Sequence, residues 1–220
     1  MKPSAAFRVE CIDRTGGQIG NNDRADDVWD AGLNQVYYLS GPSAVDGAGA
    51  GDLLVVDILD IGALPTSPWG FTGIFAKTNG GGFLTDFYPD AKKAIWDFHG
   101  IYAVSRHIHG VKFAGLTHPG LIGCAPSADC WPSGTGVKPS SSPPTPPAYH
   151  PWPTCRSPAG APGADQARQR GGNCDIKNLS RGSRVYFPVY ARGDNLSMGD
   201  IHSSQGDGEI SFCGAIEMAG

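Results

Sequence analysis

The apolar residues of this chain fall in short runs, and each run is soon interrupted by glycine or proline. Of the 220 residues, 32 are glycine and 18 are proline, and long helical periodicity is hard to find. An apolar run of about four to eight residues bounded by turn residues is typical of a β-strand. The pattern predicts a mostly β fold, with a β-sandwich or barrel-like body and only short helices.

Four segments carry this prediction. Leu53–Ile61 is rich in valine, isoleucine and leucine, and we expect a buried strand there. Ala94–Phe98 and Ile101–Val104 are expected to be two further strands separated by a short break. Arg184–Tyr190 is expected to lie at a sheet edge or bulge, because Pro188 has no N–H to donate to a neighbouring strand.

Charge and composition argue against several classes of function. The net charge is −4 and the sequence pI is near 5.8, without a long basic run, so nucleic acid and membrane are not expected as partners. The first residues lack an apolar signal core, and no stretch approaches the roughly 18 apolar residues of a spanning helix. We therefore expect a cytoplasmic protein whose six cysteines are reduced thiols.

Composition divides the chain into three segments. Residues 1–129 and 171–220 have β-rich patterns, whereas residues 130–170 are rich in proline and serine. The middle segment cannot supply a core, and its composition is typical of a disordered insert. A structureless loop of this length inside a compact domain is uncommon, which counts against native architecture.

Polar residues suited to chemistry are concentrated in residues 171–220. Asn173 and Asp175 follow a pair of glycines, His202 follows Gly-Asp-Ile, and Glu209 follows Gly-Asp-Gly. Amide, carboxylate and imidazole groups of this kind can bind a metal or move a proton. The same residues are also typical of solvent-facing turns, so the spacing leaves both interpretations open.

A predicted hairpin would bring two of these residues together. If Ile210–Cys213 pairs with Ser197–His202, the side chains of His202 and Glu209 lie within a few rows of each other. With Asp175 they would form a ligand set for a divalent cation, for which zinc is the natural candidate in a hydrolase. Without a metal, Glu209 would act as general base and His202 as general acid.

Three further residues are candidates for substrate binding. Asn173 would orient the substrate through its amide. Asp57 and Asp60 lie three apart in a predicted strand and face opposite sides, so only one of them, Asp57, is expected to reach a cavity. Gly81 can bring a backbone N–H against a substrate oxygen, although a flexible turn explains its three-glycine run equally well.

Other reactive side chains are better explained by structure. Cys174 lies among the polar motifs, and a nucleophilic thiolate is conceivable there, but a small packing residue is favoured. His107 and His118 are favoured as locally hydrogen-bonded structural histidines rather than catalytic ones.

Longer motifs run through most of the chain: Val9–Asp13, Thr15–Ile19, Tyr38–Pro42, Gly51–Gly62, Trp69–Phe75, Gly80–Asp86, Ser105–His107, Thr117–Gly123 and Gly171–Gly220. In these segments the chain resembles the acetamidase/formamidase family, and the formamidase branch in particular. The resemblance implies a β-rich, cytoplasmic, homo-oligomeric enzyme that hydrolyses a small linear amide, formamide, to formate and ammonia. It also favours a functional role for Asp175, His202 and Glu209.

The chain departs from the family pattern in ways that support a rival hypothesis. Tyr37 stands where formamidases carry histidine, and a phenol with a pKa of about 10 cannot replace an imidazole near neutral pH. Family members also extend beyond the segments that match both ends of this chain. The rival is a non-catalytic, truncated remnant of a formamidase, whose unpaired strand edges would aggregate.

The tract at 130–170 is consistent with a reading-frame error. One choice of codons for Cys130–Pro146, read one base out of frame, encodes LLAEWNRREAELIATDP, which resembles the family sequence expected there. We predict that resequencing the gene will find this alternate frame intact, with the original frame restored just before Gly171. A natural linker shared by close relatives would contradict the prediction.

Overall fold

The computed structural model describes residues 1–33, 35–82, 84–125, 171–206, 209 and 213–220, and it does not describe the side chains of residues 171–173. The tract predicted to be disordered or frameshifted, 130–170, therefore lies outside the described residues.

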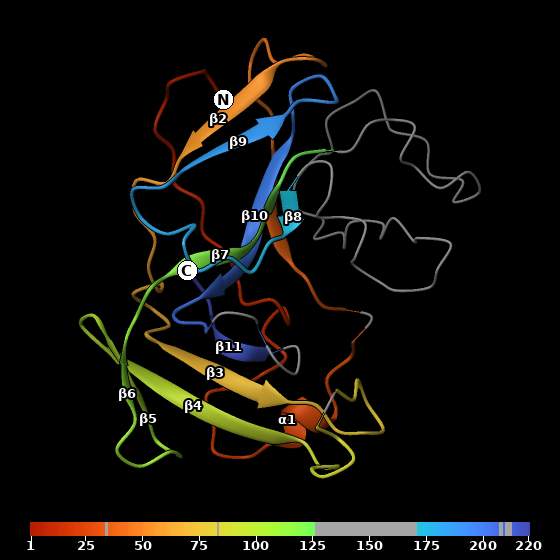
Figure 1. Cartoon of the computed structure of the whole chain (residues 1–220), viewed down its shortest axis with the longest axis vertical. Helices are drawn as coiled ribbons and strands as arrows, with labels where there is room; N and C mark the ends of the chain where they lie inside the picture. Colours follow the sequence, from red (N-terminus) through yellow and green to blue (C-terminus); the bar gives the residue numbers. More distant parts are fainter. Residues whose placement is uncertain (34, 83, 126–170, 207–208, 210–212) are drawn as a thin grey trace.

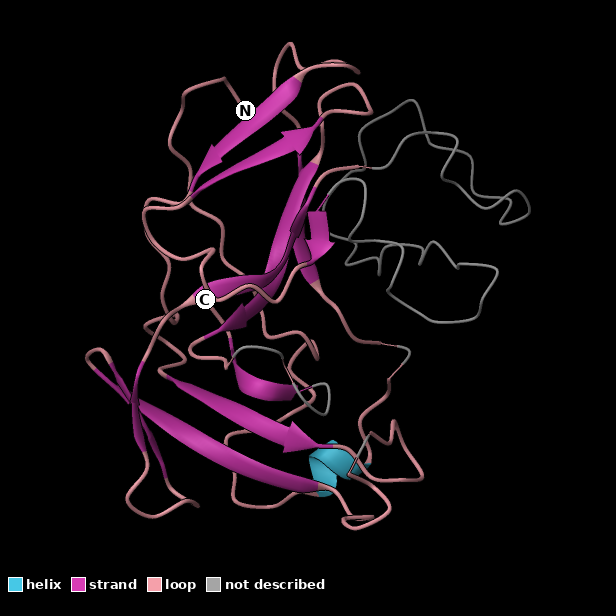
Figure 2. Cartoon of the chain, in the orientation of Figure 1, coloured by secondary structure: helices cyan, strands magenta, loops and turns pink. Residues whose placement is uncertain are grey.

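Nearly all regular structure in the described residues is β (Figures 1 and 2). The one helix, α1, covers only Asp26–Trp29. The strands are β1 (Leu39–Ser43), β2 (Leu53–Asp57), β3 (Trp69–Ile74), β4 (Lys92–His99), β5 (Tyr102–Ser105), β6 (Lys112–Ala114), β7 (His118–Gly123), β8 (Gly171–Asn173), β9 (Arg184–Pro188), β10 (Leu196–His202) and β11 (Cys213–Met218). The predicted mostly β fold is confirmed.

The strands form two antiparallel sheets. The larger sheet has the order β6-β5-β4-β3-β11-β10-β7-β8, and β1 also pairs with β10. The smaller sheet contains only β2 and β9, which lie beside each other at the top of Figure 1. Consequently β10 has β7 and β11 as direct neighbours, although β7 and β11 are far apart in the sequence.

One predicted strand differs from expectation at its end and in its burial, and another lies where it was expected. The strand expected at Leu53–Ile61 ends at Asp57 and is not buried, because Leu53 and Val55 expose 59% and 43% of their surface. Only one face of a two-stranded sheet is covered, so alternate residues meet solvent. The edge position expected for Pro188 is confirmed, since β9 pairs with β2 alone.

The largest cluster of buried apolar side chains lies where α1 packs against β3 and β4. It includes Val28 of the helix together with Phe71 and Ile95 of the two strands. Burial of each such side chain contributes about 1.5–3 kcal/mol. The buried Lys93 ammonium, 2.6 Å from the carboxylate of Asp27, ties α1 to β4. A four-residue helix has almost no stability of its own, so these contacts hold it in place.

Within the described residues, Cys11, Cys124, Cys174 and Cys213 are free thiols, and Cys130 and Cys155 lie outside them. Within the described part of the chain, no helix is long and apolar enough to cross a membrane.

The close contact between β3 and β11 depends on Gly70. A Cβ at this position would lie 2.6 Å from the backbone oxygen of Glu217 and 2.9 Å from Cγ2 of Ile216. We predict that Gly70→Ala lowers the free energy of unfolding by about 1–3 kcal/mol, the usual effect of overpacking. Gly62→Ala is the matched control, because a Cβ there would meet nothing within 4 Å. Urea unfolding of both variants checks the difference, and equal midpoints would contradict it.

Candidate functional site

Four ionisable side chains meet where β10 lies between β7 and β11. The strand register places His202 opposite Glu217 on one side and opposite His118 on the other. Asp200 lies two residues before His202 on the same strand. All four side chains are fully buried. Buried charges require opposite charges, hydrogen bonds or a bound ion to balance them.

Two residues from loops complete the arrangement. Asp175 follows β8, and Glu209 precedes β11. Ligand atoms of Asp175, Asp200 and His202 all lie within 4.8 Å of one another, and so do those of His202, Glu209 and Glu217. We call these five residues the His202 cluster.

Gly120 on β7 makes room for two of these carboxylates. A Cβ at Gly120 would lie 2.9 Å from Oδ1 of Asp175 and 2.9 Å from Oδ2 of Asp200. Both aspartates have a positive φ, 45° and 54°, which is uncommon for residues other than glycine but better tolerated by aspartate. Unusual backbone geometry of this kind is concentrated at functional sites.

The two ring nitrogens of His202 have different surroundings. Its Nε2 lies 3.4 Å from Oδ1 of Asp200 and 3.3 Å from Oε2 of Glu217. Its Nδ1 lies 2.8 Å from Oε1 of Gln205. The imidazole rings of His118 and His202 pack edge to face, with their centroids 5.1 Å apart. Asp200 and Glu217 therefore both approach His202 from its Nε2 side.

Arg14 supplies a positive charge beside the cluster. Its side chain is only 6% exposed, and Nη1 lies 3.6 Å from Oε1 of Glu217 while Nε lies 3.9 Å from Oδ1 of Asp200. Nη2 donates to the hydroxyl of Tyr37 at 3.2 Å. Tyr37, which the family resemblance predicts to stand in place of a histidine, thus contacts the guanidinium that neighbours the cluster.

Burial and mutual repulsion shift the pKa values of these groups. Burial, followed by the charge of Asp200, raises the pKa of Glu217 to about 8 and that of Asp175 to about 6. Burial opposes ionisation of Asp200, but the positive charges of Arg14 and His202 lower its pKa. Burial alone would lower the pKa of His202, yet Glu217 and Asp200 raise it well above the ordinary value. Positive charge is therefore strongly favoured between these carboxylates.

The cluster has the donor set of a divalent-cation site. Both carboxylate oxygens of Asp200 and of Glu217, Oδ1 of Asp175 and Nε2 of His202 are buried without a hydrogen-bond partner among the described residues. Buried carboxylate oxygens are normally satisfied. Carboxylate and imidazole ligands together suit zinc. Both groups of three share His202, and its Nδ1 faces Gln205, which leaves Nε2 as the nitrogen that faces carboxylates.

The structure brings the three predicted catalytic or metal-binding residues, Asp175, His202 and Glu209, to the same place. The hairpin that positions two of them differs from prediction. Its second strand is β11, which begins at Cys213, and Ile210–Phe212 lie outside the described residues. The residue opposite His202 is consequently Glu217, while Glu209 approaches from the preceding loop.

Two of the three predicted substrate-binding residues, Asp57 and Gly81, have other partners in the described structure. Asp57 lies on the two-stranded sheet, where its carboxylate pairs with Arg184 at 2.6 and 2.9 Å. The N–H of Gly81 donates to the carbonyl oxygen of Ala76, so it closes a turn and is not presented to a substrate. The side chain of Asn173 lies outside the described residues.

Cys174, His107 and His118, which were predicted to be structural residues, have different surroundings. Cys174 packs against a buried apolar group. His107 accepts a hydrogen bond from the N–H of Ile95 at its Nδ1, as expected of a structural histidine. His118 donates from its Nδ1 to the carbonyl oxygen of Leu116, but it also borders His202, which the sequence interpretation did not anticipate.

Sequence reasoning missed Arg14, Asp200, Glu217 and Gln205. A signal for Glu217 was available, because it is a single carboxylate within the apolar run Ala-Ile-Glu-Met. Asp200 and His202 share a two-residue spacing on one strand, which also hints at a common face. Nothing local connects Arg14 to residues about two hundred positions later in the chain.

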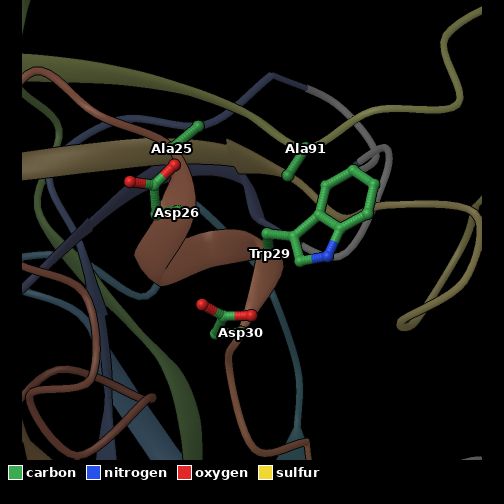
Figure 3. Close-up of a pocket in the computed structure, with 5 residues that line it drawn as sticks. All are labelled: Ala25, Asp26, Trp29, Asp30 and Ala91. Atoms are coloured by element: carbon green, nitrogen blue, oxygen red, sulfur yellow. The ribbon is translucent and has the colours of Figure 1, made fainter.

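A surface hollow of about 330 Å³ lies beside α1 and shares no lining residue with the His202 cluster (Figure 3). It is lined by Ala25, Asp26, Trp29, Asp30 and Ala91. Apart from the two carboxylates, it offers no group suited to catalysis, so it is not the candidate site.

Comparison with known proteins gives one consistent answer. The sequence profile of the Acetamidase/Formamidase family matches residues 1–220. A formamidase of Methylophilus methylotrophus is 57% identical over 237 residues, and an acetamidase of Mycolicibacterium smegmatis is 51% identical over 244 residues. Both alignments cover the whole of this chain but only 58% and 60% of the relatives.

Solved structures agree with these matches. A gamma lactamase from Delftia acidovorans superposes with a TM-score of 0.82 at 51% identity, covering 100% of this chain and 58% of that one. An acetamidase from Bacillus halodurans superposes with a TM-score of 0.68 at 28% identity, covering 96% of this chain and 57% of that one.

The raised pKa values predict how stability depends on pH in the absence of cations. Between the unfolded values of Asp175 and Glu217, 3.8 and 4.5, and the folded values of about 6 and 8, the folded chain binds more protons than the unfolded chain. The free energy of unfolding should therefore fall as the pH rises from about 5 to about 8. His202 acts in the same direction, because its pKa is also raised.

Glu217→Gln should reduce this decline by about 1 kcal/mol or more, since glutamine resembles the neutral acid and does not titrate. Urea unfolding at several pH values with a chelator present measures the slope for both proteins. The same slope in both would show that Glu217 does not titrate in this range.

Proposed function

The chain belongs to the acetamidase/formamidase family, and from that premise we propose that it provides the hydrolytic centre of an enzyme that cleaves the C–N bond of a short linear amide. The observation that carries the proposal is the His202 cluster, in which buried carboxylates converge on one imidazole. Because the chain spans only about 58% of the formamidase relative, the activity is proposed for the chain and not taken over from it.

Amide hydrolysis needs an activated water, stabilisation of the carbonyl oxygen and a proton for the departing ammonia. Glu209 is the best-placed general base, because it is only partly buried, whereas Asp200 and Glu217 are fully buried. Burial raises the pKa of Glu209, which favours proton uptake nearer to neutral pH. The proton that Glu209 takes from water would then be available for ammonia.

We propose that Asp175, Asp200, His202 and Glu217 hold a divalent cation, with zinc as the leading candidate. Their unpartnered buried oxygens and the Nε2 of His202 fit such an ion. When bound, the ion would lower the pKa of a bound water and polarise the amide carbonyl. His202 is completely buried, so its part is to bind the ion and not to protonate ammonia directly as the sequence suggested.

Formamide is the proposed substrate, on the strength of the 57% identity with a formamidase. The name of the Mycolicibacterium relative makes acetamide the first competitor. A cytoplasmic location and homo-oligomeric assembly are likewise proposals, which rest on the family resemblance alone.

We predict that Glu209→Ala lowers kcat/KM for ammonia release from formamide by about 10²–10⁴-fold, the usual contribution of a general base. Glu10→Ala is the matched control, because Glu10 is exposed and pairs only with exposed Arg8. Ammonia is measured for formamide and acetamide side by side. Equal rates for Glu209→Ala and the unsubstituted chain would remove Glu209 from the mechanism.

A non-catalytic remnant remains the second hypothesis, favoured by one specific observation. Large apolar side chains are widely exposed, including Leu59 at 68%, Phe87 at 81% and Ile101 at 68%. Exposed apolar surface of this kind favours association. A soluble chain that unfolds cooperatively and releases ammonia would support the hydrolase, whereas aggregation without ammonia release would support the remnant.

A further inference from the structure

One side-chain amide, that of Gln205, joins three segments of the site. Its Oε1 lies 2.8 Å from Nδ1 of His202 and 3.2 Å from Nε2 of His118. Its Nε2 donates to the backbone carbonyl oxygen of Asp175. Gln205 itself stands in the turn after β10, three residues beyond His202, and it is partly buried.

The orientation of this amide follows from its partners. A backbone carbonyl oxygen can only accept, so the NH₂ group of Gln205 must face Asp175. The carbonyl oxygen of the amide then faces His202, and it too can only accept. Nδ1 of His202 must therefore carry a proton and donate it to Gln205.

This hydrogen bond determines what the other nitrogen of His202 can do. In a neutral imidazole one nitrogen donates and the other accepts. With the proton held at Nδ1, the lone pair lies on Nε2, which faces Asp200 and Glu217 at 3.4 and 3.3 Å. An acceptor among carboxylates needs either a cation or a protonated carboxyl group facing it. Gln205 therefore selects the form of His202 that can bind a cation.

The same amide also restrains Asp175. The backbone of Asp175 is left-handed, with φ of 45°, and its N–H donates to the carbonyl of Gly120 at 3.1 Å. Gln205 holds the carbonyl side of the same residue. With both backbone groups fixed, the carboxylate of Asp175 is kept near Asp200 and His202.

We propose that Gln205 is a positioning residue that holds the proton of His202 on Nδ1 and fixes Asp175 beside it, so that Nε2 of His202 is presented as a cation ligand. The identity of the cation rests on the proposed function. The hydrogen bond from His202 to Gln205 rests only on the geometry of the side chains.

Three variants separate this role from a general contribution to stability. Gln205→Met keeps the length of the side chain and removes both the acceptor and the donor. Gln205→Glu keeps an acceptor for His202 and loses the donor to Asp175. Asn79→Leu is the control, because the Asn79 amide also bridges two carbonyls, those of Trp29 and Ala31, away from the cluster.

The first measurement is the imidazole N–H signal of His202 in ¹⁵N-histidine-labelled protein, assigned by its loss in His202→Asn. We expect a protected Nδ1–H signal in the unsubstituted chain, Gln205→Glu and Asn79→Leu, and its loss in Gln205→Met. Absence of the signal from the unsubstituted chain, or its persistence in Gln205→Met, would overturn the proposal.

The second measurement is the affinity for Zn²⁺ in competition with a chelator. Gln205→Met should bind about 10–100-fold more weakly, as is usual when the partner of a ligating histidine is removed, and Gln205→Glu should recover part of the loss. Unchanged affinity in Gln205→Met would overturn the positioning of the cation ligand. If no protein binds Zn²⁺ but the N–H signal still depends on Gln205, the zinc proposal fails and the positioning of His202 stands.

Discussion

The balance of charge in a buried space is the constraint on which this site depends. Asp200, His202 and Glu217 are fully buried, and Asp175 and Glu209 are partly buried beside them. Removing several carboxylates from water costs several kcal/mol for each ion unless positive charge compensates. Arg14 and a protonated His202 supply part of this positive charge. Protonation of Glu217, whose pKa is raised, removes one of the negative charges. A divalent cation would satisfy the same requirement and release those protons, so cation binding and proton binding compete for one position.

The fold supplies this position through strand order. β10 carries Asp200 and His202 in the interior of the large sheet, and its two neighbours contribute His118 and Glu217 at the rows opposite His202. Close packing on either side depends on glycines: Gly120 leaves space for two carboxylates, and Gly70 lets β3 approach β11. The strands position Asp200, His202 and Glu217, whereas Asp175 and Glu209 approach the site from loops. Gln205 restrains the backbone of Asp175.

Family membership and site geometry support each other without being the same observation. The matches to formamidase and acetamidase come from the whole sequence, including segments far from the cluster. The convergence of acidic groups on His202 is a property of the three-dimensional arrangement of the side chains. The chain spans only about 58% of the formamidase relative, so the choice of amide stays a proposal, as does the hydrolytic role of the cluster.

The sequence alone determined the mostly β class and the concentration of chemical groups after residue 171, because alternating apolar patterns, glycine turns and polar motifs are local properties. It also predicted Asp175, His202 and Glu209, which lie in such motifs and which the structure brings close together. It could not identify Arg14, Glu217 or the amide of Gln205 as their partners. It predicted a substrate-binding role for Asp57, whose carboxylate instead pairs with Arg184. Those assignments depend on which strands become neighbours and in which register. Strand pairing joins residues far apart in the chain, and a one-residue change of register would turn Glu217 away from His202. Only the tertiary structure decides that.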